Sequence, residues 1–339
     1  MVWSHIRNNM LMVLLKKLKP YTLLIAVSLG FLVFCFFRFT KLSMPLRPTA
    51  HFIGESLPVI LFFILFFAFS KITLHQMKPR AWHFILVIYQ IISTALLALY
   101  LRSYSGEQNI VILEGILICL ITPTAASASV ITGKLGGNES SLTTYIIFSN
   151  LAAAIAIPLI FPMFCDMGNN SFFHDCFLIL NHISPILVLP MILTVIIRTF
   201  SPKLHQFILR NTKEIGFYLW AFIIVVVSAK TFANIEASDK TATEITLMAA
   251  VGFFMTILQF ALAKGIGQFG GQRISAGQAL GQKNMVFGLW VTLTYLNPTV
   301  AIIPGTYILW QNVVNAWQMW YREKNLRIWE QKGERPYQE

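Results

Sequence analysis

Long apolar runs alternate with short polar stretches along almost the whole chain. Ten of these runs are long enough to cross the hydrocarbon of a membrane, which takes an α-helix of about 20 residues. They cover residues 20–38, 56–75, 81–101, 110–133, 140–165, 176–199, 214–233, 244–264, 275–296 and 298–321. Because no stretch alternates polar and apolar residues at period two, a β-barrel is not expected. The pattern predicts an all-α polytopic membrane protein with ten transmembrane helices.

Two of the ten runs contain residues that do not suit a helix surrounded by lipid. Residues 121–133 include Pro123 and a group of hydroxyl side chains. A lysine near the centre of a bilayer costs about 2.5–3.5 kcal/mol on insertion scales, so it normally faces a protein interior or a wet cavity. Within residues 275–290, the polar side chains among the glycines are Gln278, Gln282, Lys283 and Asn284.

The two interrupted runs occupy matching places when the chain is divided into halves. The ten runs divide as five plus five, and the interrupted ones are the fourth run of each half. An odd number of spans per half makes the halves point in opposite directions, so we expect two inverted repeats with discontinuous fourth and ninth helices. Paired broken segments of this kind indicate a transporter's binding site. Unwound backbone is tolerated only where protein, water or substrate meets it, and half-helix N-termini favour anions.

Composition and charge support a membrane protein rather than a nucleic-acid-binding one. The chain is 56% hydrophobic and only 12% charged, although its net charge is +12. When the N-terminus is placed in the cytoplasm, most lysines and arginines fall on the cytoplasmic side. We therefore expect both termini to be cytoplasmic, the lipid bilayer to be a partner, and the location to be the inner (plasma) membrane of a bacterium. Oligomeric state does not follow from the sequence.

Smaller features allow more than one interpretation. Cys165 and Cys176 flank the loop CDMGNNSFFHDC, and they either pair on the oxidising side of the membrane or remain free thiols. Four prolines inside the runs are expected to kink helices rather than to form sites, namely Pro158, Pro185, Pro190 and Pro304.

Three stretches resemble motifs of the bile acid:sodium symporter family. ITPTAASASVITGKLGGN resembles its CPGGTASN-type motif, LGQKNMVFGLW its EVGMQNSGLA motif, and PTVAIIPGTYILWQNVVNAW its PLAALPAALFSVWHNLSGS pattern. The resemblance implies a core of helices 3–5 and 8–10 and a panel of helices 1, 2, 6 and 7. Substrate would lie between core and panel, with two sodium ions behind the crossing of helices 4 and 9. The implied parts are residues 1–75 (N-terminal arm and panel helices 1–2), 76–165 (core helices 3–5), 166–233 (panel helices 6–7), 234–321 (core helices 8–10) and 322–339 (a cytoplasmic basic tail).

The resemblance also implies site residues. The family's threonine-alanine-serine-asparagine falls on Ala126–Ser129, and an alternative register uses Thr124. The asparagine after the family's glutamine falls on Asn284, and the polar pair of the tenth helix falls on Gln311 and Asn312. We therefore expect the following residues to bind substrate: Thr124, Ser127, Ser129, Gln282, Asn284 and Asn312.

The chain departs from the family where sodium would bind. The family's coordinating glutamate aligns with Ala279 or, shifted by one residue, Gln278, and its glutamine aligns with Lys283. Its hydroxyl ligands on the fifth helix fall on Leu142 and Ile146, although Ser141, Thr143 and Thr144 are adjacent. Sodium needs several oxygen ligands, preferably including a carboxylate, by the logic that governs hard cations. We therefore expect no sodium, no other metal and no cofactor, with the Lys283 ammonium standing in for a cation. If Lys283 titrates, proton coupling is an alternative.

Other roles for these polar residues remain open from sequence alone. Lys283 can snorkel to an interface if the centre of its segment is displaced. Ser127, Ser129 and Thr132 can simply bond to preceding helix carbonyls, as hydroxyls in membrane helices often do. Glu114 is either a relay residue or an interfacial one.

The sequence favours a secondary-active transporter of a small organic anion, either a carboxylate or a bile-acid-like amphipath, that works by alternating access. Lys283 and the half-helix N-termini favour an anion. The alternative is a non-transporting membrane receptor built on a transporter scaffold. Because no nucleophile–base pair or phosphate-binding loop is found, we do not expect an enzyme.

Overall fold

The computed structural model describes residues 22–40, 45–72, 77–104, 109–165, 171–212, 214–332 and 338–339. Within these ranges the regular structure is helical, with no strand longer than an isolated bridge. The prediction of an all-α polytopic membrane protein is therefore confirmed. The N-terminal arm before residue 22 and residues 333–337 of the predicted tail lie outside the described residues.

Helix occupies each of the ten predicted ranges. Among the described residues, five helices are long and apolar enough to cross a membrane, and up to seven spans result if each of two bent pairs counts as one. In chain order the helices are α2 (Thr22–Phe39), α3 (Arg47–Glu55), α4 (Leu57–Ser70), α5 (Ala81–Ser103), α6 (Ile110–Ile121), α7 (Ala128–Lys134), α8 (Glu139–Ile160), η4 (Phe161–Met163), α9 (Phe172–Leu187), α10 (Leu189–Phe200), α11 (Pro202–Asn211), α12 (Ile215–Ala237), α13 (Ala242–Phe269), α14 (Arg273–Gly281), α15 (Met285–Tyr295), η5 (Pro298–Ala301) and α16 (Ile302–Lys332).

Both predicted interruptions are breaks between helices. The fourth range holds α6 and α7, separated at residues 122–127, and the ninth holds α14 and α15, separated at residues 282–284. A further break that the apolar pattern did not predict divides the sixth range into α9 and α10, which meet at 43°. Pro185 and Pro190 flank that break, and neither supplies the backbone N–H that a continuous helix needs. Their predicted role as kinks is confirmed, whereas Pro158 and Pro304 lie inside α8 and α16.

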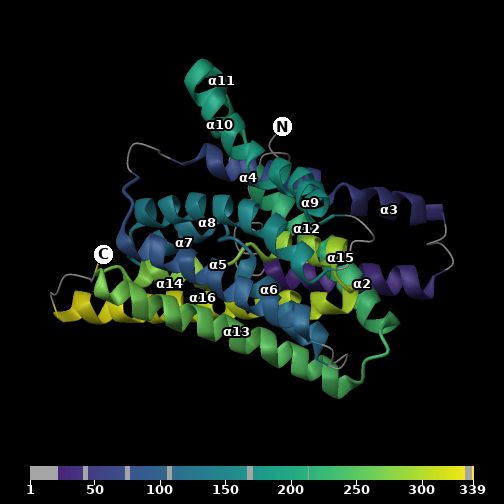
Figure 1. Ribbon diagram of the computed structural model, residues 1–339. Coiled ribbons are helices and arrows are strands. Elements are labelled where there is room, and N and C mark those ends of the chain that lie inside the picture. Colours follow the sequence, from purple (N-terminus) through teal and green to yellow (C-terminus); the bar gives the residue numbers. More distant parts are fainter. Residues whose placement is uncertain are drawn as a thin grey trace, which may run out of the picture.

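The helices pack in two groups. In the first, α2 lies along α12, and α4 contacts α9, α10 and α12. In the second, α13 lies beside α14 and α16, and α6 contacts α5, α13 and α16 (Figure 1). Contacts of α8 with α9 join the two groups. Buried leucine, isoleucine and alanine side chains fill both, while many of the exposed side chains are large and apolar, as a lipid-facing surface requires.

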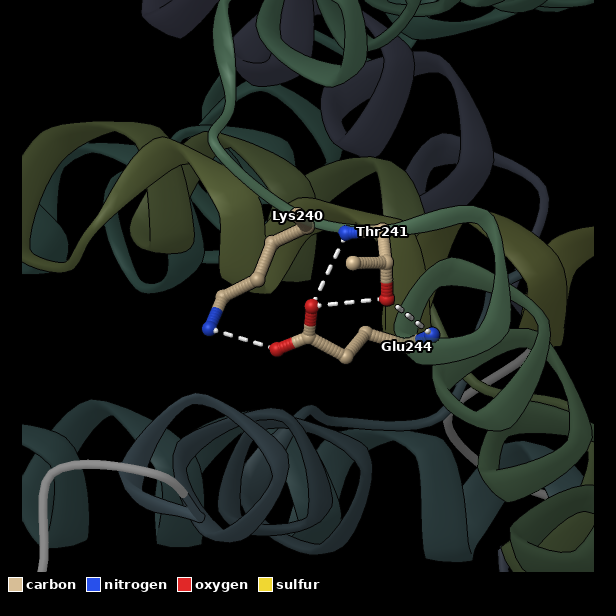
Figure 2. Close-up of polar contacts among 3 residues, drawn as sticks. All are labelled: Lys240, Thr241 and Glu244. Carbon is tan, nitrogen blue, oxygen red and sulfur yellow. Dashed lines mark hydrogen bonds and ion pairs between the residues drawn. The ribbon is translucent and has the colours of Figure 1, made fainter.

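The longest uninterrupted apolar helix, α13, begins at a well-formed cap. Glu244 accepts hydrogen bonds from the Thr241 backbone N–H at 2.8 Å and the Thr241 hydroxyl at 2.9 Å (Figure 2). In return, the Glu244 N–H donates to the Thr241 hydroxyl oxygen, and Lys240 donates to the second carboxylate oxygen at 3.0 Å. This capping box satisfies amides that would otherwise lack partners and fixes where α13 starts.

The four cysteines carry free thiols, including Cys165 and Cys176. Of the two alternatives for this pair, the structure has the unpaired one.

Candidate functional site

The two breaks meet each other and pair as a short antiparallel bridge between Thr124 and Lys283. The Ala125 N–H donates to the Gln282 carbonyl at 2.9 Å, and the Asn284 N–H donates to the Pro123 carbonyl at 2.8 Å. Unwound backbone in an apolar interior requires hydrogen-bond partners, and here each break supplies partners for the other. We call this pairing of residues 122–127 with 282–284 the crossover.

The side chains at the crossover reach across it reciprocally. The Thr124 hydroxyl donates to the carbonyl of Ala279, and the Lys283 ammonium donates to the carbonyl of Leu120 at 3.0 Å. Each acceptor lies four residues before the donor's bridge partner, since Leu120 precedes Thr124 and Ala279 precedes Lys283 by that spacing. Each break therefore binds the last turn of the helix that leads into the other break.

Two glutamines that were not predicted as site residues donate to backbone carbonyls at the C-terminal end of α6. The Gln259 amide donates to the Cys119 carbonyl at 2.9 Å, and the Gln90 amide donates to the Ile121 carbonyl at 2.7 Å. With Lys283 on the carbonyl between them, three successive carbonyls at the C-terminus of α6 have side-chain donors. In the sequence, these two residues are recognisable as a glutamine in the middle of a largely apolar helix, α5 or α13.

Lys283 is buried in protein rather than extended toward an interface. Only 1% of its surface is exposed, and its backbone N–H donates to the Gln311 side-chain oxygen at 3.0 Å. The snorkelling alternative is therefore wrong. A helix C-terminus carries partial negative charge, so the ammonium stabilises the end of α6. Among the described residues, no carboxylate forms an ion pair with Lys283.

The structure brings some predicted site residues to the crossover and not others. Gln282 donates from its amide to the Ser127 hydroxyl at 3.3 Å, and Asn284 caps α15 by accepting from the Phe287 N–H at 3.4 Å. Ser129 instead bonds to the Ala126 carbonyl of its own turn. The Asn312 amide likewise donates to Ile308 of its own helix, and its neighbour Gln311 is the residue that reaches Lys283.

The residues at the positions of the family's sodium ligands do not form an oxygen-rich cage. Leu142, Ile146 and Ala279 are buried and apolar, and Gln278 donates to Asn315 on α16. In the part of the chain that the structure describes, no cluster of three or more histidines, cysteines or carboxylates is able to hold a metal. The donor set does not fit a hard cation, which needs several oxygens.

The Glu339 carboxylate lies at the N-terminal end of α14. Glu339 accepts hydrogen bonds from the Ser275 N–H at 3.0 Å, the Ser275 hydroxyl at 2.7 Å and the Ile274 N–H. Its own N–H donates to the Gly136 carbonyl at 3.0 Å, and the Asn138 N–H donates to the Ser275 hydroxyl at 2.8 Å. A carboxylate suits the N-terminus of a helix, so this contact stabilises the first turn of α14.

Glu339→Ala is expected to speed hydrogen exchange of the first-turn amides of α14 by about tenfold, which corresponds to about 1.4 kcal/mol. Hydrogen bonds to charged groups contribute about 1.5–3 kcal/mol, so an effect of this size follows from losing the carboxylate. Hydrogen-exchange mass spectrometry of the peptide covering 272–282 measures it. Gln338→Ala, at the exposed neighbouring position, is the matched control. Equal exchange in both variants would mean that the Glu339 contact contributes nothing in solution.

Comparison with known proteins identifies a family whose model matches most of the chain. The family model of the SBF-like CPA transporter family matches residues 59–313, a region that contains both breaks and the crossover. No curated protein matches the chain.

Proposed function

The chain belongs to the SBF-like CPA transporter family, and from this premise we propose that it is a secondary-active transporter of an organic anion that works by alternating access. The observation that carries the proposal is the crossover. Two helices that break inside a membrane protein and satisfy each other's backbone form a fixed point of the kind that transporters use to bind substrate.

The proposal includes ten spans in two inverted five-helix repeats, with both termini in the cytoplasm. Helix in all ten ranges supports it, as does the reciprocal pattern at the crossover, because inverted repeats place equivalent residues in equivalent contacts. The division of the helices into two packing groups supports the proposed panel and core. In this mechanism the panel moves against the core, and the crossover stays intact.

An anion suits the electrostatics of the proposed site. The α15 N-terminus begins at the crossover, and its backbone amides favour negative charge. Ser127 is exposed and lies beside the N-cap residue Asn284, so it is accessible to a substrate, whereas the Gln282 amide that donates to it is buried. Thr124 and Lys283 would support the site from behind, because both are fully buried. Ser129 and Asn312 remain predicted substrate ligands, although each bonds to its own helix.

We further propose that transport does not depend on sodium. The Lys283 ammonium donates to the Leu120 carbonyl at the C-terminal end of α6, where positive charge is most favourable, and the surrounding residues lack a cation's oxygen ligands. A metal cation beside this ammonium would be repelled at short range.

Counterflow in proteoliposomes tests the proposal against a non-transporting receptor. Purified protein is reconstituted with an unlabelled organic acid inside, and entry of the labelled acid is followed with sodium and with sodium replaced by choline. We expect labelled carboxylates or sulfonates to accumulate equally in both buffers. A receptor would show thermal stabilisation by the same acids but no exchange. Clear stimulation by sodium would refute sodium independence while leaving transport itself intact.

A further inference from the structure

A polar stripe runs along the buried face of α16. Gln311, Asn315 and Gln318 follow one another at four and three residues, the spacing that places side chains on one face of a helix. Their exposed fractions are 7%, 2% and 8%, so all three amides lie inside the protein. Uncompensated amides in such an interior are costly, so a row of three requires partners.

Each of the three residues of the stripe forms a hydrogen bond with a polar group from another element; the position of each residue along α16 is called a level. Gln311 accepts from the Lys283 N–H at 3.0 Å, at the crossover. Asn315 accepts from the Gln278 amide at 2.9 Å, and Gln318 accepts from the Lys264 ammonium at 2.9 Å. The stripe therefore leads from the crossover, past α14, to α13. One turn beyond Gln318, Arg322 lies against Gly136.

These contacts leave three buried atoms of the stripe and its partners without hydrogen bonds among the described residues. They are the Gln278 oxygen and the side-chain nitrogens of Asn315 and Gln318. The set is one acceptor and two donors. A metal cation needs more oxygens, and an anion would be repelled by the Gln278 oxygen. Water is able to accept twice and donate twice, and buried waters typically make about three hydrogen bonds.

The same kind of incomplete pairing occurs at the crossover end. The side-chain oxygens of Gln90 and Gln259 are buried without partners among the described residues, although their nitrogens bind the end of α6. Lys283 has three ammonium hydrogens, of which one donates to Leu120. Water bound here would accept from the ammonium and donate to the amide oxygens.

The spacing of the levels suits a single file of water molecules. At a rise of about 1.5 Å per residue, Gln311 and Asn315 are about 6 Å apart along the axis and Asn315 and Gln318 about 4.5 Å. Two hydrogen bonds of about 2.8 Å at the roughly tetrahedral angle of one water join atoms about 4.5 Å apart. One water therefore spans the step from Asn315 to Gln318, and two waters in file span the longer step from Gln311 to Asn315.

We propose that this stripe lines an aqueous access route, one water wide, which connects Lys283 with the end of the core where α14 begins. The route rests on the proposed transport function and specifies how solvent reaches Lys283, which is fully buried. Two ammonium groups, Lys264 and Lys283, face it and repel metal cations, so its occupant is water. Other ionisable groups near the crossover end are Cys119, Tyr89 and Tyr307. Near the end where α14 begins they are Arg273, Arg322 and Glu339.

Cysteine accessibility tests the route without requiring transport. Asn315→Cys and Gln318→Cys are introduced where the native cysteines have been replaced by alanine, and they are treated with a small charged methanethiosulfonate. The control is Val313→Cys on the same helix, because this apolar position is 54% exposed and faces lipid in a membrane. We expect the two stripe positions to react at least tenfold faster than position 313. If the cysteine-free background fails to fold, labelling above that of the wild type gives the same comparison.

Leucine substitutions along the stripe provide a second test, which measures both the melting temperature and transport. The pair Gln278→Leu with Asn315→Leu removes both partners of one buried hydrogen bond together with their unpaired atoms, so the melting temperature should stay level or rise. Gln318→Leu also removes the acceptor of the Lys264 ammonium, so its melting temperature should fall. Transport should fall about tenfold, because water no longer reaches Lys283. Unreactive stripe cysteines together with leucine variants that transport like wild type would overturn the route. Reactive cysteines in a protein that shows no counterflow would refute the transport proposal and leave the route standing.

Discussion

Lys283→Met is expected to lower anion counterflow by about 10- to 100-fold. The substitution keeps the apolar stem and removes the ammonium that bonds to the Leu120 carbonyl. A buried carbonyl left without its donor costs about 1–3 kcal/mol, and the favourable interaction with the end of α6 is lost as well. A cost of this size shifts the population of a competent conformation by about 5- to 150-fold. Initial rates in proteoliposomes measure the effect, and the melting temperature in detergent should fall with them.

Lys283→Gln separates the charge from the shape of the site. Glutamine is the residue at this position of the family motif that the chain resembles, and it donates hydrogen bonds without carrying charge. We expect the sodium-independent counterflow of the wild type to disappear in this variant. Lys324→Met, an exposed lysine near the end of α16, is the control and should transport normally. If Lys283→Gln transports as well as wild type without sodium, the ammonium is not a cation surrogate.

Gly267→Ala is expected to destabilise the protein, whereas Gly265→Ala on the same helix is not. A Cβ at Gly267 would collide with the Ala276 side chain and the backbone carbonyl of Gln272, and neither group is able to rotate away. A Cβ at Gly265 meets nothing within 4 Å. Overpacking typically costs about 1–3 kcal/mol, against a gain of about 1 kcal/mol when alanine replaces glycine in a helix.

The two glycine variants share their chemistry and differ only in packing. Thermal unfolding in detergent should therefore give a melting temperature lower by a few degrees for Gly267→Ala, and unchanged or higher for Gly265→Ala. Because α14 carries the crossover at its C-terminal end, its displacement from α13 should also reduce counterflow. Equal melting temperatures would show that α13 and α14 do not pack closely at this point in the membrane.

The amino-acid sequence alone specifies the fold class of this protein and the positions of its two helix breaks, because both follow from local physical chemistry. Long apolar runs of helical length specify an all-α membrane protein, because hydrocarbon accepts only segments that satisfy their own backbone. Pro123 and the polar group around Lys283 mark both breaks for the same reason, since neither suits an unbroken helix in lipid. The cost of placing an ammonium in lipid favours an interior position for Lys283, although the sequence left snorkelling to an interface as an alternative. These inferences need no knowledge of which helices are neighbours.

The tertiary structure decided which groups those marked residues meet. Gln311 and Asn312 are adjacent in sequence, but about 100° of helix rotation separates their side chains, so only the packing of α16 selects Gln311 for the crossover. Gln90 and Gln259 meet the end of α6 only because α5 and α13 pack beside it. The carbonyl of Leu120 likewise has no distinguishing side chain, and it became the partner of Lys283 only because two distant breaks cross. Long-range packing decides which backbone carbonyl accepts a side-chain hydrogen bond and which face of a helix turns inward. Neither can be read directly from the identities of the residues.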